Sequence, residues 1–370
     1  MSSKQDVRKY LRQHLEDLEP YRGVETIDSL AERYGLDVSQ IVKLDANENP
    51  YGPSPLVYQA LANLQDINRY PDPLSTSLRR KIAEYAGVTT EQVLVGAGAD
   101  EIIELLIRLF VGTGEAVVDC QPTFSMYSLF TLQNAGEVID VPRGDDWNID
   151  LQSILKVLAA WPVKLVFICS PNNPTGNLVS EQDVVRLLDT GIPVVIDEAY
   201  YEFAGKTFVG LLPRYPNLFI VRTFSKLAGL AGLRVGYLLA SEIIVNELLK
   251  IKQPYNVTVA GQAAALASLQ DIDRLQDNVR RLVEERERMF TKLREQGVLQ
   301  PYPSKANFLL CRVNGDAKLV REELAKRGIF VRHFSKPRIQ DCLRVSVGLP
   351  EHTDRLIEAL DDIKNSVLIG

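Results

Sequence analysis

Short apolar runs alternate with amphipathic stretches through the middle of this 370-residue chain, beginning near residue 92. The run at 93–95 precedes residues 100–110, in which Ile, Leu and Phe recur at helical spacing. The same order continues through runs at 116–119, 163–169, 194–196 and 218–221, with helix-like stretches over 123–133 and 181–189. Such alternation predicts an α/β domain with a mainly parallel sheet that helices cover on both faces.

The length of the chain predicts two domains, because single cores usually stop growing at roughly 250–300 residues. Residues 1–45 are expected to form an arm and part of the smaller domain, with a first helix that ends before Pro20 and a second over 27–34. Residues 46–257 would form the large domain, and 258–370 a smaller α+β domain. Within the latter we expect one long helix over about 260–296, strands at 308–311, 329–331 and 343–347, and helices over 316–327 and after Pro350.

The composition excludes several classes of protein. The net charge is −6 with dispersed Lys and Arg, which gives no sign of nucleic-acid binding, and no apolar run approaches the roughly 18 residues of a membrane span. The N-terminus has no signal-peptide core, which predicts a cytoplasmic protein. The cysteines form no C-x-x-C pair, which argues against a zinc site and favours buried, reduced thiols at Cys120, Cys169, Cys311 and Cys342.

A lysine segment follows the run at 218–221. Lys226 comes directly after Ser225, and the segment from it to Arg234 contains the small residues Ala228, Gly229, Ala231 and Gly232, so another group can approach it closely. Most lysines are solvated surface charges, but a partly desolvated lysine near cations loses its proton and becomes a nucleophile that can form a Schiff base. Ser225 and Arg234 supply a hydroxyl group and a fork of donors suited to a phosphate.

Polar residues end two predicted strands upstream of this lysine. Asp197 follows the run at 194–196, where a carboxylate can keep a pyridinium nitrogen protonated. Tyr200, three residues later, and Asn173, in the turn over 170–176, can hydrogen-bond a phenolate oxygen. Taken singly, the Asp fits a helix cap and the Asn a plain turn.

A glycine-containing turn lies between the first predicted strand and its helix. Glu101 stands where a dinucleotide-binding fingerprint needs a third glycine, which argues against a Rossmann-type dinucleotide site. The amides of Ala99 and Asp100 can still bind a single phosphate at the helix N-terminus, although Asp100 is also a plausible simple cap. Phe124 can stack on a flat heterocycle or belong to the core. Together with the lysine segment, these groups are those needed to hold pyridoxal phosphate.

The chain resembles the fold type I, aspartate-aminotransferase superfamily of pyridoxal-phosphate enzymes, and within it the histidinol-phosphate aminotransferase family. The cofactor motifs carry the first resemblance, and the segments at 44–50 and 197–203 narrow it. The resemblance implies a large domain with a mainly parallel seven-stranded sheet sandwiched by helices, a smaller α+β domain, and pyridoxal 5′-phosphate as cofactor. One departure concerns the substrate pocket, because relatives often carry an aromatic residue where this chain has Gly229 among small residues.

The resemblance also implies a role for each site residue. Lys226 would bind the cofactor and shuttle a proton from the substrate Cα. Tyr70 would reach the cofactor phosphate of the partner subunit, which requires a homodimer. The remaining cofactor contacts would come from Ala99, Asp100, Phe124, Asn173, Asp197, Tyr200, Ser225 and Arg234. Substrate would meet Tyr21, Asn47, Asn307, Arg332 and Arg344.

The implied reaction is a ping-pong transamination between L-histidinol phosphate and 2-oxoglutarate, giving imidazole-acetol phosphate and L-glutamate. An aromatic amino-acid aminotransferase and a threonine-phosphate decarboxylase share the fold and cofactor and stay open as alternatives. A non-catalytic regulator is a more distant alternative, because Lys226 is present and no helix-turn-helix segment is left over.

Overall fold

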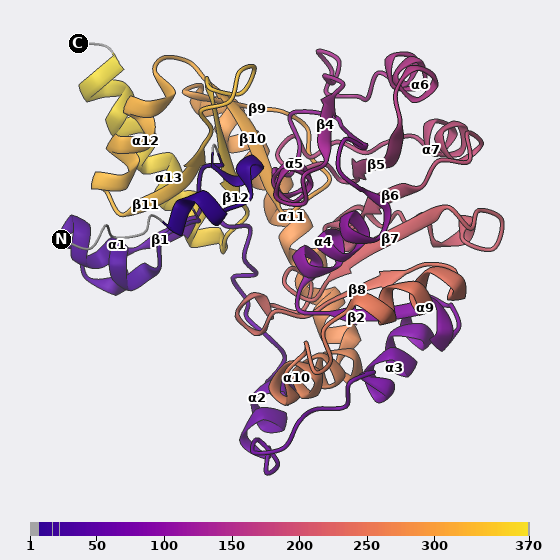
Figure 1. The fold of residues 1–370 in the computed structure, drawn as a ribbon. Helices are drawn as coiled ribbons and strands as arrows, with labels where there is room; N and C mark the ends of the chain where they lie inside the picture. The colour runs from indigo at the N-terminus through magenta and orange to yellow at the C-terminus, as the bar shows by residue number, and fades with distance from the viewer. Residues whose placement is uncertain (1–6, 17, 22, 369–370) are drawn as a thin grey trace, which may run out of the picture.

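Two β-sheets organise the computed structural model, which describes residues 7–16, 18–21 and 23–368 (Figure 1). The larger sheet is mainly parallel and has the seven strands expected, with β8 antiparallel to both of its neighbours. The apolar runs predicted as strands between residues 93 and 221 all lie in it, and the three predicted after residue 300 lie in the smaller sheet. In spatial order the strands of the larger sheet are β2 (Val93–Gly96), β8 (Gly236–Leu239), β7 (Leu218–Thr223), β6 (Val194–Asp197), β5 (Val163–Cys169), β3 (Ala116–Asp119) and β4 (Glu137–Asp140). The predicted fold class is confirmed.

Both faces of this sheet are buried, which explains why its strands are continuous apolar runs. Along β5, Leu165 and Phe167 face one apolar cluster, while Val166 and Ile168 face the other. Side chains of α4 (Ala99–Phe110), α5 (Met126–Gln133) and α9 (Glu242–Ile251) complete the first cluster. The second receives α2 (Pro55–Ala62), α3 (Thr76–Ala86), α6 (Leu151–Ala160), α7 (Glu181–Leu188), α8 (Tyr201–Ala204) and α10 (Val259–Gln270).

The smaller sheet combines the two ends of the chain. Its order is β1 (Val42–Leu44), β11 (Ile329–His333), β12 (Cys342–Ser346), β10 (Phe308–Val313) and β9 (Leu299–Pro301). The helices of this part are α1 (Ile27–Tyr34), α11 (Ile272–Gln296), α12 (Ala317–Lys326) and α13 (Pro350–Ile363). The domain division at residue 257 stays a prediction, since α10 packs against α2 and α3 although it follows that point in the sequence.

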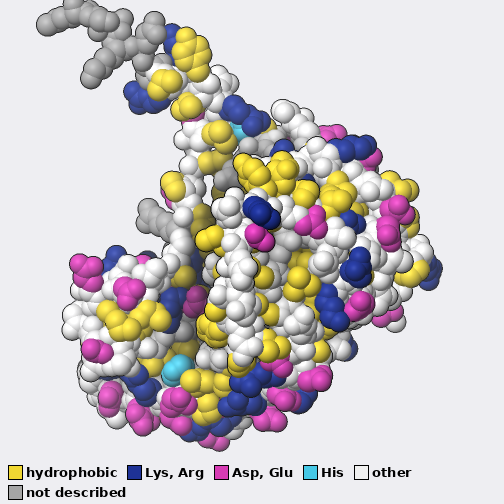
Figure 2. Space-filling model, turned by 90° about the horizontal axis from the view of Figure 1, so that it is seen from below, with side chains coloured by type: hydrophobic (Ala, Val, Ile, Leu, Met, Phe, Trp, Pro, Cys, Tyr) yellow, Lys and Arg dark blue, Asp and Glu magenta, His cyan; other side chains and the backbone are white. Residues whose placement is uncertain are grey.

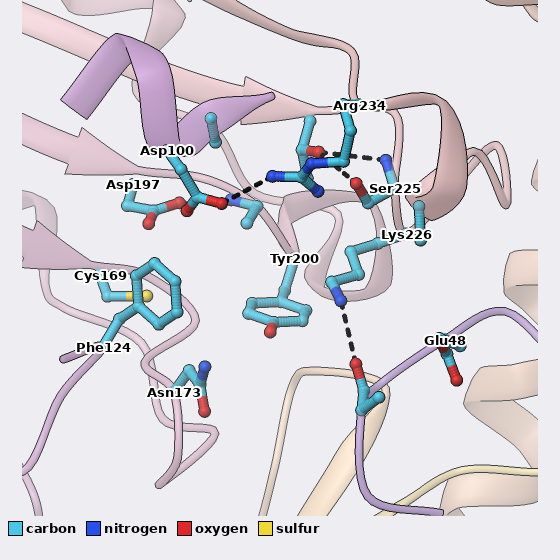
Figure 3. A pocket seen from close by; sticks show the side chains of 15 residues that line it. Glu48, Asp100, Phe124, Cys169, Asn173, Asp197, Tyr200, Ser225, Lys226 and Arg234 are labelled. Carbon is cyan, nitrogen blue, oxygen red and sulfur yellow. Dashed lines mark hydrogen bonds and ion pairs between the residues drawn. The ribbon is translucent and has the colours of Figure 1, made fainter. Parts of the chain in front are cut away.

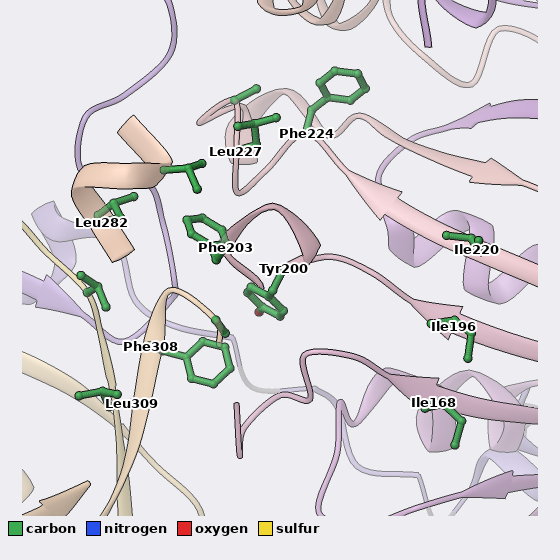
Figure 4. Close-up of a cluster of buried hydrophobic side chains, with 14 of the residues drawn as sticks. Ile168, Ile196, Tyr200, Phe203, Ile220, Phe224, Leu227, Leu282, Phe308 and Leu309 are labelled. Atoms are coloured by element: carbon green, nitrogen blue, oxygen red, sulfur yellow. The ribbon is translucent and has the colours of Figure 1, made fainter. Parts of the chain in front are cut away.

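The apolar core continues from the larger sheet to the smaller one (Figure 4). Ile168, Ile196 and Ile220 of three neighbouring strands line one side of it. Beyond the strand ends, the ring of Tyr200 packs edge-on against Phe308 of β10, with centroids 5.1 Å apart. The cofactor and substrate residues are therefore mounted on two sheets that share one packed interior.

The long helix predicted over about 260–296 is wrong, because two helices meet there at Asp271. The backbone of Asp271 leaves helical geometry, with φ −116° and ψ 37°, and its carboxylate accepts a hydrogen bond from the Ser54 hydroxyl. This tertiary contact fixes the corner between α10 and α11 at a place where the sequence reads as continuous helix.

Two other helix predictions also need correction. The helix expected from Thr123 begins only at Met126, because the Thr123 hydroxyl donates to Asn172 Oδ1 at 2.7 Å and holds the preceding residues in a loop. The first helix of the arm is replaced by two 3₁₀ turns, Val7–Tyr10 and Gln13–Leu15. None of the residues in these turns is buried, so they gain no packing energy that would extend them.

The surface shows no field of a single sign in the view from below, where basic, acidic and apolar side chains are interspersed (Figure 2). All four cysteines are buried and unpaired, as predicted. Within the described ranges, none of the helices combines the length and apolar character needed to cross a bilayer.

A buried ion pair secures the end of β6 to β7. Glu198 and Arg222 have side chains only 0% and 3% exposed, and Arg222 Nε donates to Glu198 Oε2 at 2.9 Å. The other carboxylate oxygen accepts from the Phe208 amide at 2.6 Å, and the guanidinium lies 3.7 Å from the centroid of the Tyr201 ring.

Replacing Arg222 by Met should destabilise the protein by about 3–5 kcal/mol, because the carboxylate of Glu198 would be left buried without its counter-ion. Urea unfolding followed by circular dichroism measures the loss. The matched control is Lys81→Met, which removes an exposed ion pair of 2.9 Å to Glu84 and should cost less than about 1 kcal/mol. Equal effects of the two changes would contradict this role for the buried pair.

Candidate active site

A cavity of about 240 Å³ lies at the carboxyl edge of the larger sheet (Figure 3). Strands β3, β5, β6 and β7 are parallel, so the loops that follow them meet at this edge. All of the predicted cofactor residues except Tyr70 line this cavity. They are Ala99, Asp100, Phe124, Asn173, Asp197, Tyr200, Ser225, Lys226 and Arg234.

Lys226 lies on the loop after β7 and extends its amine into this cavity, where Nζ donates to the Ala46 carbonyl at 3.2 Å (Figure 3). Burial, and then the positive charge of Arg344, lower the pKa of the amine from 10.5 to about 8. Because a neutral amine is a nucleophile and a proton acceptor, this environment prepares Lys226 for both tasks near neutral pH.

Asp197 ends β6 and is 3% exposed. Its Oδ2 accepts from the Tyr127 hydroxyl at 2.6 Å, and Oδ1 accepts from the Ala199 amide at 3.0 Å. Burial raises the pKa of this carboxyl to about 6, although both hydrogen bonds oppose the rise. A cationic N–H group placed beside it would restore the ionised form.

Sequence reasoning missed Tyr127, which orients this carboxylate. Its ring stacks on Phe167 with centroids 4.7 Å apart and packs edge-on against Phe124. The available signal was its spacing: it follows Phe124 by three residues, but that segment was singled out only for its first aromatic residue.

A phosphate-sized cradle lies where β2 passes into α4. The first amides of α4, those of Ala99 and Asp100, have no partner within the helix. Arg234 Nη2 donates to Asp100 Oδ2 at 2.6 Å, which directs the guanidinium across this helix end. Gly98 has a φ of 86°, which favours glycine, and a Cβ there would lie 2.7 Å from Arg234 Nη2 and displace the guanidinium from this helix end.

Two arginines face each other on the smaller sheet. Arg332 of β11 pairs directly with Arg344 of β12, although like charges at opposed positions repel. Arg344 is 8% exposed, donates to Asn173 Oδ1 and the Asp45 carbonyl at 2.7 Å each, and its Nε has no hydrogen-bond partner. A buried cation with an unused donor beside a second cation indicates a site for an anionic ligand.

Asn47 ties the two sheets together. Its Nδ2 donates to the Tyr200 hydroxyl at 3.1 Å, and its Oδ1 accepts from Ser346 at 2.8 Å. Asn307 Nδ2 donates to the Asn47 carbonyl at 3.1 Å. Burial raises the pKa of Tyr200, so its hydroxyl keeps its proton and can donate.

A second cavity, of about 630 Å³, opens beside the first and shares Phe124, Asn173, Tyr200 and Lys226 with it. Of the predicted substrate residues, Tyr21, Asn47, Arg332 and Arg344 line it. Asn307 is absent from the lining and reaches the site through Asn47.

Tyr70 lies outside both cavities. Its side chain is 80% exposed and stacks on Tyr255, with ring centroids 4.5 Å apart. Nothing within its own subunit brings it to the residues of the cofactor cavity, so its predicted contact depends on a partner subunit.

The donor set fits pyridoxal phosphate. The buried carboxyl of Asp197 suits a ring N–H, the cradle around Gly98 suits a phosphate, and Lys226 offers an amine of lowered pKa in the same cavity. Asn173 and Tyr200 line the same cavity with polar groups suited to the ring oxygen.

Residues 39–360 match the family model for aminotransferases of class I and II, and the chain belongs to that family. It is 45% identical to the histidinol-phosphate aminotransferase of Dehalococcoides mccartyi, over 97% of this chain and 99% of that protein. It is 46% identical to the chloroplastic histidinol-phosphate aminotransferase 1 of Arabidopsis thaliana, over 95% of this chain and 85% of that protein.

The crystal structure of histidinol-phosphate aminotransferase from Sinorhizobium meliloti in complex with pyridoxal-5′-phosphate superposes with a TM-score of 0.89 at 28% identity, covering 99% of this chain and all of that one. The family predicted from the sequence is confirmed, and the predicted cofactor is the one bound in that relative.

The reactivity of Lys226 should titrate with a midpoint near pH 8 in the cofactor-free protein, against about 10.4 for a free lysine. The neutral amine forms as the pH rises through this value. Mass-spectrometric mapping of an amine-labelling reagent over pH 6–11 (roughly the range spanning both values) measures it. Arg344→Gln should raise the midpoint because it removes a neighbouring positive charge. An unchanged midpoint near that of free lysine would contradict the desolvated environment.

Proposed function

We propose that this chain is a pyridoxal-phosphate-dependent aminotransferase that exchanges an amino group between L-histidinol phosphate and 2-oxoglutarate, giving imidazole-acetol phosphate and L-glutamate. The observation that carries the proposal is the opposed pair Arg332 and Arg344 in a cavity continuous with the cofactor residues. Both amino substrates carry an anionic group next to the amine-bearing carbon, a phosphate ester in L-histidinol phosphate and the α-carboxylate in L-glutamate, and two cations suit a phosphate as well as a carboxylate.

Bound pyridoxal phosphate supplies an electron sink that makes the substrate Cα–H acidic. Lys226 Nζ, whose pKa lies near 8, accepts the proton from that carbon and carries it along the face of the site. Asp197, held by Tyr127, keeps a ring N–H charged. Phe124 would stack on the ring, and Asn173 and Tyr200 would donate to its oxygen.

The phosphate group of the cofactor would be held by the α4 amides of Ala99 and Asp100 and by Ser225 and Arg234. A helix N-terminus and a guanidinium fork are both suited to this charge. Arg332 and Arg344 would bind the anionic group of the substrate, while Asn47, supported by Asn307, fixes the Tyr200 hydroxyl, and Tyr21 lines the same cavity.

We also infer a homodimer with shared sites, and a reducing, cytoplasmic location that suits four buried thiols. Tyr70 is exposed together with large apolar side chains close to it in the chain, Ile67 and Leu74, and with Tyr255, on which it stacks. This exposure supports contact with a second copy.

The purified protein should transaminate L-histidinol phosphate with a kcat/KM about 100-fold or more above that for L-phenylalanine, because phenylalanine offers the cations a carboxylate with one negative charge, whereas the phosphate monoester carries about 1.5 to 2. Both assays follow 2-oxoglutarate-dependent product formation, and L-threonine phosphate is tested for carbon dioxide release. A preference for phenylalanine would assign an aromatic aminotransferase, and carbon dioxide release would assign a decarboxylase. Lys226→Ala controls for activity from contaminants.

A heterodimer of Lys226→Ala and Tyr70→Ala subunits should have about half of the wild-type activity, whereas each variant homodimer should be nearly inactive. In the heterodimer one site receives both an intact lysine and an intact partner tyrosine. Co-expression with two affinity tags isolates the mixed species. Activity no greater than that of the homodimers would contradict the role of Tyr70 across the subunit boundary.

A further inference from the structure

A third cation lines the substrate cavity. Lys336 lies on the loop between β11 and β12, partly buried, and contributes to the same wall as Arg332 and Arg344. Its Nζ donates to Gln121 Oε1 at 3.3 Å, so the loop of the smaller sheet is linked to the end of β3 in the larger one.

Gln121 is itself held by several partners. Its backbone amide donates to Asp140 Oδ1 at 3.1 Å, and its Nε2 lies 3.4 Å from both Asp119 Oδ2 and Ser128 Oγ. An amide side chain has a donor end and an acceptor end. With the donor end occupied by the Asp119 and Ser128 oxygens, the acceptor end is left facing Lys336.

The buried carboxylate of Asp119 interacts electrostatically with Lys336. Asp119 is 1% exposed, and its Oδ1 is buried without a hydrogen-bond partner. Burial raises the pKa of this carboxyl to about 6, and the Ser128 hydrogen bond and then the positive charge of Lys336 oppose the rise. The charge of Lys336 therefore favours the ionised form of Asp119 across Gln121.

The charge around the cavity favours a dianion. Asp45, the acidic residue of the described wall, is paired with Lys43 at 2.9 Å, and three cationic side chains, Arg332, Arg344 and Lys336, line the same cavity. A carboxylate offers one negative charge, whereas a phosphate monoester carries about 1.5 to 2 at neutral pH and three acceptor oxygens. A third cationic donor, Lys336, therefore adds little for a carboxylate but matches the third oxygen of a phosphate.

We propose that Lys336 is a specificity-determining residue that binds the terminal phosphate of a phosphate-monoester substrate, and that Gln121 and Asp119 are positioning residues that hold its ammonium at the cavity wall. The inference rests on the proposed function and deepens it. The two arginines accept either substrate, and Lys336 favours the phosphorylated one. A point charge on a flexible stem suits this task, because it can stay on Gln121 when the ligand is a carboxylate.

Lys336→Met should raise the KM for L-histidinol phosphate by about 10- to 100-fold, the value of a charge-assisted hydrogen bond. The kcat for this substrate, and the KM for L-glutamate in the reverse reaction, should change by less than about threefold. Calorimetric binding of L-histidinol phosphate to the holoenzyme should weaken in parallel. Lys336→Arg should restore most of the affinity, and Lys318→Met, an exposed lysine on α12, is the matched control.

The variant Gln121→Leu tests whether Gln121 positions the Lys336 ammonium or only stabilises the fold. It should raise the same KM by a smaller factor, and the double variant with Lys336→Met should be no worse than Lys336→Met alone, since both changes remove one contact. Additive effects, or equal losses for glutamate and histidinol phosphate, would overturn the proposal. Thermal melting of each variant identifies losses caused by unfolding.

Failure of this inference is distinguishable from failure of the proposed function. If wild type prefers L-histidinol phosphate and Lys336→Met keeps that preference, only the role of Lys336 is wrong. If wild type itself acts on phenylalanine and ignores the phosphate ester, the proposed function and the inference built on it both fall.

Discussion

Uncompensated charge in a dry interior is the constraint on which this site depends. Asp197 is buried against two neutral donors, and Arg344 is buried against two neutral acceptors with Arg332 directly opposite. Such burial is unfavourable without counter-ions. A ligand that brings a cationic ring nitrogen to Asp197 and an anionic group to Arg344 supplies the counter-ions that the protein does not provide. Part of the free energy of ligand binding thus comes from neutralising these buried charges, and the rest of the fold holds the charged side chains in position.

The framework can hold these charges because it is packed on every side. The larger sheet is buried on both faces, and its core continues to Phe308 of the smaller sheet. The ion pair of Glu198 and Arg222 adds a fixed polar anchor one residue beyond Asp197. Side chains mounted on such elements cannot relax away from an unfavourable charge, so they stay aimed at the ligand.

The sequence predicted the strands, and it predicted residues that the structure brings together in one cavity, because both depend on local order. Apolar runs ending in Asp197 or before Lys226 imply strand ends, and parallel strands bring those ends to one edge. The corner at Asp271 and the late start of α5 depended instead on contacts from Ser54 and Asn172, which lie far away in the chain. Tyr127 and Lys336 were missed for the same reason, since their partners Asp197 and Gln121 come from other elements.

The hydrogen bonds around Asn47 have a consequence for substrate specificity. One amide group couples the Tyr200 hydroxyl to Ser346 and, through its carbonyl, to Asn307, so the reaction chemistry and the sheet that carries the arginines share a common support. Lys336 lies on the loop between β11 and β12, bonds to Gln121, and takes no part in these hydrogen bonds. If Lys336 selects the substrate as proposed, a substitution there would change which molecule binds while the hydrogen bonds of Asn47 stay in place.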